Sequence, residues 1–369
     1  MNLRVPGPTP CPDPVLEAVG QQMINHRGPE FAQLIGRVTA DLKAVFETEN
    51  DLLILTSSGT GALEAAVVNT LSPGERCLVI SVGVFGDRFA QIASAFGADV
   101  RRLDFPHGTA ADPDAVRKCL RDGPAISTVF LTHNETSTGV TNDLEALSGV
   151  IKGEFDKTLV VDGVSSISSV PCPVDRWGID LAVSGSQKGW MAPPGLAMVS
   201  VSPRGWEAVA AAKMPRVYFD LAAAKQALEL GQTPWTPALS TLYGLQRGAA
   251  LLLEEGMEAV YQRHAEIGAH TRQLVEGLGL ELFADPRHAS NTVTAIKVPP
   301  GVDWKVLSRT LRETHSVELA GGQGPLSGTI FRIGHLGWVN AGEIDQVASA
   351  LEASLASLRA LPSVPARSS

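Results

Sequence analysis

The distribution of hydrophobic residues predicts two structurally different parts of the chain. Between about residues 50 and 205, short runs rich in Val, Ile and Leu alternate with helical patterns. The runs expected to be strands are Leu52–Leu55, Arg76–Ser81, Asp99–Leu103, Thr128–Leu131, Thr158–Val161, Leu181–Val183 and Leu196–Val201. Helices are expected between them, for example at Gly61–Leu71, Arg88–Phe96 and Asp112–Leu120. Such alternation predicts an α/β domain with a mostly parallel sheet covered on both faces, which binds ligands beyond the carboxyl ends of its strands.

The C-terminal part predicts a smaller α+β domain. Its expected elements are helices at Leu239–Glu255 and Met257–Leu278, a strand at Thr292–Val298, a helix near Trp304–His315, a strand at Thr329–Ile333 and a helix near Ala341–Leu358. Gly256 separates the first two helices. We therefore expect an N-terminal arm over residues 1–20, a large domain over 21–250 and a small domain over 251–361. The Pro- and Ser-rich residues 362–369 are expected to be a disordered tail.

Composition narrows the class of partner. Hydrophobic residues make up 44% of the chain and charged residues 19%, which suits a soluble globular protein. The net charge is −9 and no block of Lys or Arg stands out, which argues against nucleic acid or an anionic membrane as the main partner. The N-terminus lacks an apolar signal core. The cysteines are scattered without a CxxC pair and the histidines without HExxH, so we expect a cytoplasmic protein with no metal site.

A Ser- and Gly-rich turn is a candidate phosphate site. Thr56–Gly61 follows one expected strand and opens the next expected helix. A phosphate there would meet backbone N–H groups, hydroxyl donors and the positive end of the helix dipole. The segment has neither a GKS/GKT ending nor a GxGxxG pattern, which disfavours ATP and NAD. An ordinary turn with a helix N-cap is the alternative interpretation.

A carboxylate and an amine follow two neighbouring expected strands. Asp162 ends the run Leu159–Val161, and Lys188 follows Leu181–Val183. Pyridoxal phosphate needs an amine that forms a Schiff base with its aldehyde and a carboxylate that keeps its pyridine nitrogen protonated. Burial of Lys188 would supply the neutral amine. Alternatively, Asp162 pairs with a helix N-terminus or an arginine, and Lys188 is a surface lysine.

Two further side chains fit the same cofactor. Phe85 follows the strand at Arg76–Ser81 and can stack on a flat ring. Thr136 follows the strand at Thr128–Leu131, and its hydroxyl can bond the phenolic oxygen of the cofactor. A core phenylalanine and a self-satisfied polar turn are the alternatives. The cofactor is favoured because a phosphate turn, an aromatic ring, a hydroxyl, an aspartate and a lysine follow successive strands in this order.

On these residues the chain resembles the class V aminotransferases of PLP fold type I, and particularly their alanine/serine–glyoxylate (serine–pyruvate) branch. The resemblance runs from Pro6-Gly7-Pro8 to Arg332-Ile333-Gly334 and includes Glu135-Thr136-Ser137-Thr138-Gly139 and Asp162-Gly163-Val164. It implies a large domain whose mostly parallel seven-stranded sheet lies between helices. The cofactor-binding residues that it implies are Ser58, Gly59, Thr60, Phe85, Thr136, Asp162, Gln187 and Lys188.

The resemblance also implies two contacts from other parts of the chain. Thr236, within Thr233–Pro237, would reach the cofactor phosphate of a neighbouring subunit, which implies a homodimer with shared active sites. Arg332 would hold the substrate α-carboxylate, a role that suits a planar guanidinium. Asn134 and Trp190 depart from the family pattern, and both bear on substrate choice.

The expected reaction is a ping-pong transamination with Lys188 as the base. A small amino acid (serine or alanine) would donate its amino group to a small 2-oxo acid (glyoxylate or pyruvate). A lyase such as a cysteine desulfurase would need a nucleophilic cysteine on a loop over the site, and Ala320–Leu326 has none. A transaminase for phosphate- or phosphonate-bearing substrates would need a further basic group. A non-catalytic accessory protein is disfavoured by the intact set of Lys188, Asp162 and Arg332.

Overall fold

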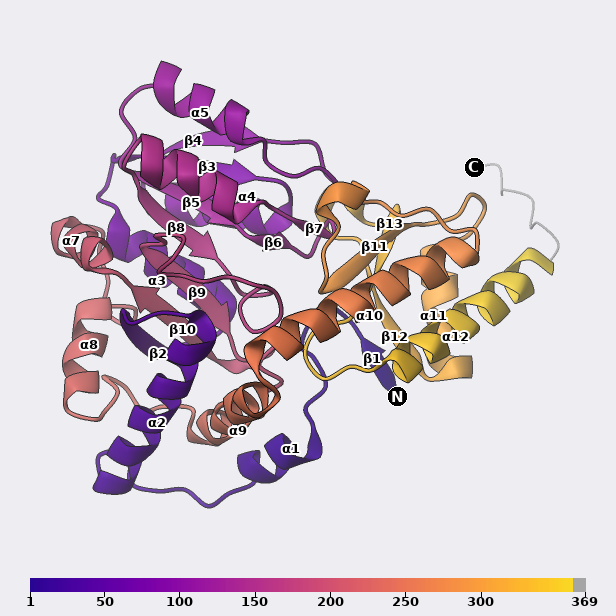
Figure 1. Cartoon of the computed structure of the whole chain (residues 1–369), viewed down its shortest axis with the longest axis horizontal. Coiled ribbons are helices and arrows are strands. Elements are labelled where there is room, and N and C mark those ends of the chain that lie inside the picture. Colours follow the sequence, from indigo (N-terminus) through magenta and orange to yellow (C-terminus); the bar gives the residue numbers. More distant parts are fainter. Residues whose placement is uncertain (361–369) are drawn as a thin grey trace, which may run out of the picture.

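The computed structural model describes residues 1–360, which form two regions, each built on its own sheet. Figure 1 shows the larger region on one side and the smaller on the other, with helix α10 (Met257–Gly277) running between them. The α/β fold with a smaller C-terminal domain is confirmed. The expected tail at 362–369 lies outside the described residues, and the expected domain limits stay a prediction.

The larger sheet has seven strands, and all seven were expected. They are β2 (Asp51–Ser57), β3 (Arg76–Ser81), β4 (Asp99–Asp104), β5 (Thr128–Thr132), β8 (Thr158–Asp162), β9 (Leu181–Gly185) and β10 (Gly195–Val201). Their order is β2-β10-β9-β8-β5-β3-β4, and only β10 runs antiparallel to its neighbours. The strands β5, β8 and β9 therefore end at one edge, where Asp162 is the last residue of β8.

Helices cover both faces of this sheet. They are α2 (Pro29–Phe46), α3 (Gly59–Thr70), α4 (Val84–Ala95), α5 (Pro113–Asp122), α6 (Leu144–Ser148), α7 (Pro203–Ala211), α8 (Leu221–Glu229) and α9 (Leu239–Glu255), with α1 (Asp13–Val19) beside α9. Successive strand residues belong to opposite cores: Leu78 packs in the cluster of α2, and Val79 packs in the cluster of α3. Helix α4 begins four residues earlier than expected, so Phe85 lies in its first turn.

The smaller sheet contains a strand from the opposite end of the chain. Its order is β1-β12-β13-β11, formed by β1 (Asn2–Arg4), β11 (Val293–Lys297), β12 (Val317–Gly321) and β13 (Ile330–Gly334). The expected strands correspond to β11 and β13, whereas β1 and β12 were not expected. Helices α10, α11 (Trp304–His315) and α12 (Ala341–Ala360) complete this region. The chain therefore runs from the small sheet into the large region before it forms its first long helix.

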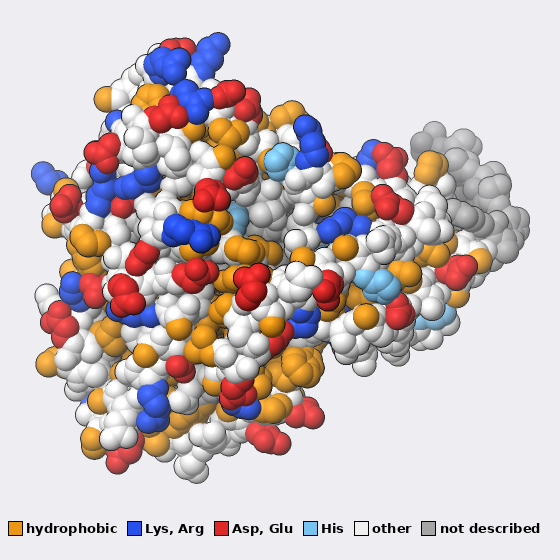
Figure 2. Space-filling model, in the orientation of Figure 1, with side chains coloured by type: hydrophobic (Ala, Val, Ile, Leu, Met, Phe, Trp, Pro, Cys, Tyr) orange, Lys and Arg blue, Asp and Glu red, His pale blue; other side chains and the backbone are white. Residues whose placement is uncertain are grey.

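Short elements and surface features complete the description. A two-stranded hairpin of β6 (Asn134–Glu135) and β7 (Val140–Thr141) follows β5, a π-helical turn spans Gly149–Glu154, and 3-10 turns span Pro286–His288 and Gly324–Leu326. Figure 2 shows acidic and basic side chains interspersed over the visible face. None of the helices within residues 1–360 combines the length and the apolar character that crossing a membrane requires. All four cysteines are free thiols, and the cytoplasmic location stays a prediction.

Candidate functional site

The structure places Asp162 at the end of one strand and Lys188 just beyond the end of its neighbour. Asp162 ends β8 and is buried; the Val164 N–H donates to its Oδ1 at 2.9 Å. Its Oδ2 takes no hydrogen bond from any part of the chain that the structure describes. Lys188 lies three residues beyond β9 and is partly buried. Its Nζ donates to the Pro6 carbonyl oxygen at 2.5 Å, so the N-terminal arm crosses the site at the lysine.

Burial shifts both of these groups towards their neutral forms. It raises the pKa of Asp162 to about 6, although the Val164 N–H works in the opposite direction. It lowers the pKa of Lys188 to about 8, although the charge of Asp162 opposes this shift. The positive charge of Arg332 lowers the pKa of Lys188 further, so the arginine lies within electrostatic reach of the amine. The site therefore contains a lysine that loses its proton far more readily than one in water.

The N-terminal arm approaches Lys188 too closely to carry a side chain. Gly7 has φ +127°, and a Cβ there would lie 2.5 Å from Lys188 Nζ. The Thr9 hydroxyl donates to the Lys188 carbonyl oxygen at 2.8 Å, and the Thr9 N–H donates to that of Gln187 at 3.1 Å. The arm is thus fixed along the segment that carries the lysine.

The Ser58–Thr60 turn has the properties of an anion site. Helix α3 begins at Gly59, and the side chain of its N-cap, Ser58, makes no capping hydrogen bond. A Cβ on Gly59 would lie 2.9 Å from the side chain of Val164. The turn therefore packs against Val164, which follows Asp162 by two residues. The side-chain Oε1 of Gln187 is buried without a hydrogen-bond partner. Free N–H groups and hydroxyls beside a helix N-terminus fit a phosphate group, and of the Gln187 amide only the NH₂ group can donate to one.

Glu135 fixes the position of Phe85 and was not expected as a site residue. It is completely buried, and its Oε2 accepts hydrogen bonds from the N–H groups of Phe85 at 3.0 Å and Gly86 at 3.2 Å. Its Oε1 accepts from the Ser137 N–H at 3.1 Å and the Ser137 hydroxyl at 2.6 Å. Burial raises the pKa of Glu135, and these four donors counteract the shift. A carboxylate thus binds the first turn of α4, where the helix dipole favours negative charge.

Arg332 and Thr136 meet between the two regions of the chain. Arg332 projects from β13 and is buried. Its Nε and Nη2 donate to the Gly321 carbonyl oxygen at 3.0 and 2.7 Å, and its Nη1 donates to that of Thr136 at 2.9 Å. Burial lowers the pKa of Arg332 to about 10, while the nearby charge of Glu135 opposes the shift. Because neutral carbonyls hold this cation, its charge is available to an anionic ligand.

A second arginine near the site was not expected either. Arg88 Nη1 donates to Thr60 Oγ1 at 3.1 Å. The Arg88 guanidinium also lies over the Phe85 ring, 4.7 Å from its centroid. Arg88 could not be selected from sequence, because Thr60 lies on another helix, α3, and Phe85 lies before the expected start of the helix at Arg88.

The sequence profile described as aminotransferase class-V matches residues 2–333. This chain belongs to the class V aminotransferases. It is 42% identical over 359 residues to the soluble hydrogenase small subunit of a Synechococcus strain, covering 96% of this chain and 93% of that protein. It is 39% identical over 349 residues to the serine–glyoxylate aminotransferase of Methylorubrum extorquens, covering 92% of this chain and 87% of that protein. It superposes on an alanine–glyoxylate aminotransferase from Nostoc with a TM-score of 0.92 and 32% identity, covering 96% of this chain and 94% of that one.

Membership of this family confirms three of the predictions. The protein is an aminotransferase, its fold is that of PLP fold type I, and pyridoxal phosphate is its cofactor. The uncapped N-terminus of α3 and the free Oδ2 of Asp162 both fit that cofactor. Within residues 1–360, no three His, Cys, Asp or Glu side chains gather as a metal site would require.

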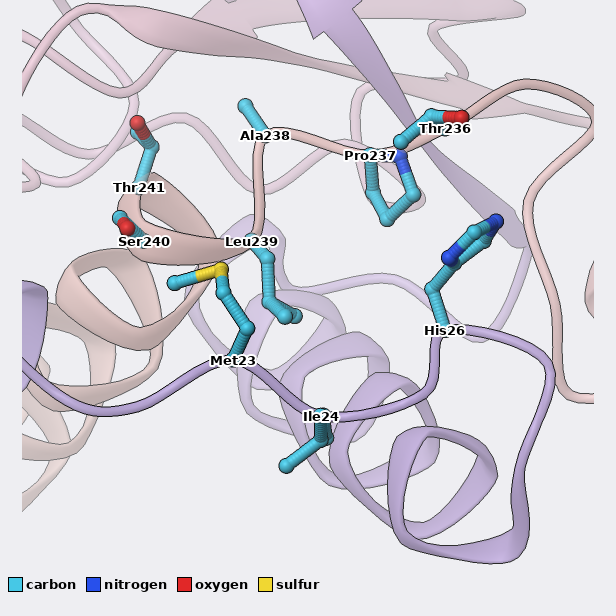
Figure 3. Close-up of a pocket in the computed structure, with 9 residues that line it drawn as sticks. All are labelled: Met23, Ile24, His26, Thr236, Pro237, Ala238, Leu239, Ser240 and Thr241. Atoms are coloured by element: carbon cyan, nitrogen blue, oxygen red, sulfur yellow. The ribbon is translucent and has the colours of Figure 1, made fainter.

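Thr236 lies close to the strand that leads into the phosphate turn, because the Ala238 N–H two residues on donates to Thr56 Oγ1 at 3.1 Å. It is exposed in the segment between α8 and α9 and lines a cavity of about 370 Å³ with Met23, His26 and Ser240. Figure 3 shows Thr236 and His26 at the same end of this cavity. Neither Asp162 nor Lys188 lines it. The expected contact of Thr236 with the cofactor phosphate of a neighbouring subunit stays a prediction.

The two departures from the family pattern have structural explanations. The Asn134 amide donates to the hydroxyls of Ser165 and Thr292, both at 2.8 Å, and accepts from Thr141 at 2.7 Å and Ser290 at 2.6 Å. It thereby connects the two regions. Trp190 is fully buried, stacks on Phe46 with 5.8 Å between ring centroids, and donates to the Ser184 hydroxyl. Neither side chain has hydrogen-bonding capacity left for a substrate.

Proposed function

We propose that the protein transfers an amino group from a small amino acid, serine or alanine, to a small 2-oxo acid, glyoxylate or pyruvate. The mechanism is ping-pong, so the first oxo acid leaves before the second binds. The observation that carries the proposal is the buried Arg332, held by two carbonyl groups within electrostatic reach of Lys188. The Methylorubrum and Nostoc relatives, named as serine–glyoxylate and alanine–glyoxylate aminotransferases, support the choice of substrates.

Each expected residue has a role in this proposal. The cofactor, when bound, supplies the carbonyl group that receives the amino group and a ring that withdraws electrons from the substrate. Its phosphate is bound by Ser58, Gly59, Thr60 and Gln187, its ring by Phe85, and its phenolic oxygen by Thr136. Asp162 accepts the N–H of the ring nitrogen at its free Oδ2.

Lys188 and Arg332 act on the substrate. Lys188 removes the proton from the substrate α-carbon, and its lowered pKa of about 8 provides the unprotonated amine for this step. Arg332 binds the α-carboxylate and must give up part of its bonding to Gly321 and Thr136 to do so. The substrate is thereby oriented with its α-carbon towards the lysine.

We also propose a homodimer in which Thr236 reaches the cofactor phosphate of the partner. An exposed apolar surface around this segment supports a second copy as the occupant. Trp235 is 40% exposed and stacks on Tyr218, which is 47% exposed, and Met23 on the cavity wall is 52% exposed. Mixing Lys188→Ala and Thr236→Val subunits tests the sharing. If sites are shared, the hybrid has one site with both defects and one intact site, and activity recovers.

A screen of half-reactions tests the proposed substrates. The cofactor absorbance of the purified protein is followed as single amino acids are added, and the cofactor is then restored with glyoxylate or pyruvate. Serine or alanine should change the absorbance within a turnover time, and Lys188→Ala should abolish the change. Equally slow responses to every α-amino acid would contradict transamination of small substrates.

A further inference from the structure

The phosphate turn contains no cation of its own. Ser58–Gly61 offers hydroxyls and backbone N–H groups, whereas a phosphate monoester carries a charge between −1.5 and −2 near neutral pH. Arg88, from α4, is a guanidinium in hydrogen-bond contact with this turn. In the part of the chain that the structure describes, no carboxylate lies within ion-pair distance of Arg88. Its charge is therefore not already neutralised.

We propose that Arg88 is a positioning residue for the cofactor phosphate and acts through the hydroxyl of Thr60. A threonine hydroxyl has one hydrogen to donate and two lone pairs. Because Arg88 Nη1 donates to Thr60 Oγ1 at 3.1 Å, the hydroxyl keeps its hydrogen for another acceptor. Thr60 lies in the first turn of α3, where the N–H groups and dipole attract the phosphate, so a phosphate oxygen is that acceptor.

The same guanidinium also supports the ring platform. It lies 4.7 Å from the centroid of Phe85 on one face, which leaves the opposite face for the cofactor ring. Glu135 holds the backbone of Phe85, and Arg88 holds its side chain. One residue thus couples the N-terminus of α3, which binds the phosphate, to that of α4, which carries the ring contact.

Electrostatics at the lysine agree with this placement. The positive charge of Arg88 contributes to the lowered pKa of Lys188 and favours the ionised form of Asp162. Loss of the charge should therefore raise the pKa of Lys188.

Cofactor binding to the apoprotein tests the inference, with pyridoxal as the phosphate-free control. Arg88→Gln should weaken pyridoxal phosphate binding about tenfold to a hundredfold, as expected for a charge-assisted contact. Pyridoxal binding should change less than about threefold. Arg88→Lys, which keeps the charge, should recover part of the loss. Thr60→Val combined with Arg88→Gln should weaken binding by less than the product of the single effects, because both act on one phosphate oxygen.

Two results would overturn the inference. Equal losses for both ligands would mean that Arg88 acts on the ring alone. Unchanged binding of both, with a raised KM for an amino acid that carries a second acidic group, would assign Arg88 to the substrate. The inference rests on the cofactor placement in the proposed function. If the wild-type protein does not bind pyridoxal phosphate, the cofactor placement itself is refuted. If the wild type binds it but the Arg88 variants show no selective loss of pyridoxal phosphate over pyridoxal, only the inference is refuted.

Discussion

Replacing Glu135 by Gln should destabilise the protein although it preserves the shape of the side chain. The two carboxylate oxygens of Glu135 accept two hydrogen bonds each, from Phe85 and Gly86 on one side and from two donors of Ser137 on the other. A glutamine has only one acceptor oxygen. Whichever way the amide turns, two buried donors face its NH₂ group.

The expected cost follows from the number of donors left without acceptors. Each buried unsatisfied donor costs about 1–3 kcal/mol. Loss of the negative charge at the N-terminus of α4 adds about 0.5–1 kcal/mol. Relief of the desolvation that raises the pKa of Glu135 works in the opposite direction. We expect a net loss of about 2–4 kcal/mol, a large fraction of the ~5–15 kcal/mol that stabilises a typical folded protein.

Urea unfolding and amide exchange of the apoprotein measure this effect at two levels. Tryptophan fluorescence gives the loss in unfolding free energy, and hydrogen exchange at Phe85 and Gly86 gives the loss of local protection. Ser137→Ala is the comparison variant. It removes one donor to Glu135 and the hydroxyl that accepts from the Val84 N–H at 3.0 Å, but it leaves both Glu135 oxygens in place, and it should cost about 1–2 kcal/mol. The reasoning is refuted if Glu135→Gln unfolds within about 0.5 kcal/mol of the wild type and both amides exchange at the wild-type rate.

Other predictions concern the charged groups of the site and the arm. Since the pKa of Lys188 is about 8, the rate of cofactor capture by the apoprotein should rise with pH and level off above about 8, as stopped-flow absorbance can show. Because folding raises the pKa of Asp162 from 3.8 to about 6, the folded apoprotein binds more protons than the unfolded chain between these values. Its stability should therefore fall as the pH rises from about 4 to 6, and Asp162→Asn should flatten this slope in urea titrations. Arg332→Gln should raise the KM for the amino donor about tenfold or more and leave cofactor affinity within about threefold, which steady-state kinetics and cofactor titration can separate. Gly7→Ala should slow cofactor capture because the new Cβ would occupy space within 2.5 Å of Lys188 Nζ; capture at the wild-type rate would show that the arm moves away.

The larger sheet was predictable because its strands are buried on both faces. Strands buried on both faces, such as β5 and β8, appear in the sequence as continuous apolar runs, so they can be recognised without knowledge of their partners. The strand β1 has three residues, and its partner β12 lies at the far end of the chain. A strand this short is defined by its pairing with a distant strand, and the local hydrophobic pattern carries no information about that pairing. In contrast, β12 alternates buried Val317 and Leu319 with a less buried Glu318, a pattern typical of a half-buried strand that the sequence itself contains.

The site was predictable where a residue's role depends on its position at a strand end. Asp162 and Lys188 belong to this class, and the structure places them near each other. Glu135 also follows a buried strand and could have been found by the same rule. Arg88 could not, because Thr60 belongs to another helix, and Phe85, three residues earlier in α4, lies outside the helix expected at Arg88–Phe96.

The positive charge at the site favours the binding of anionic ligands. Lys188 lies within electrostatic reach of Arg332, Arg88 and Asp162, and burial lowers the pKa of Lys188 and Arg332. Cations buried without direct anionic partners destabilise the folded state. A cofactor phosphate and a substrate carboxylate are anions, so each would supply the missing partner at a different end of the site. Because such ligands bind only the folded protein, the free energy of unfolding should be higher for the protein with bound cofactor than for the apoprotein.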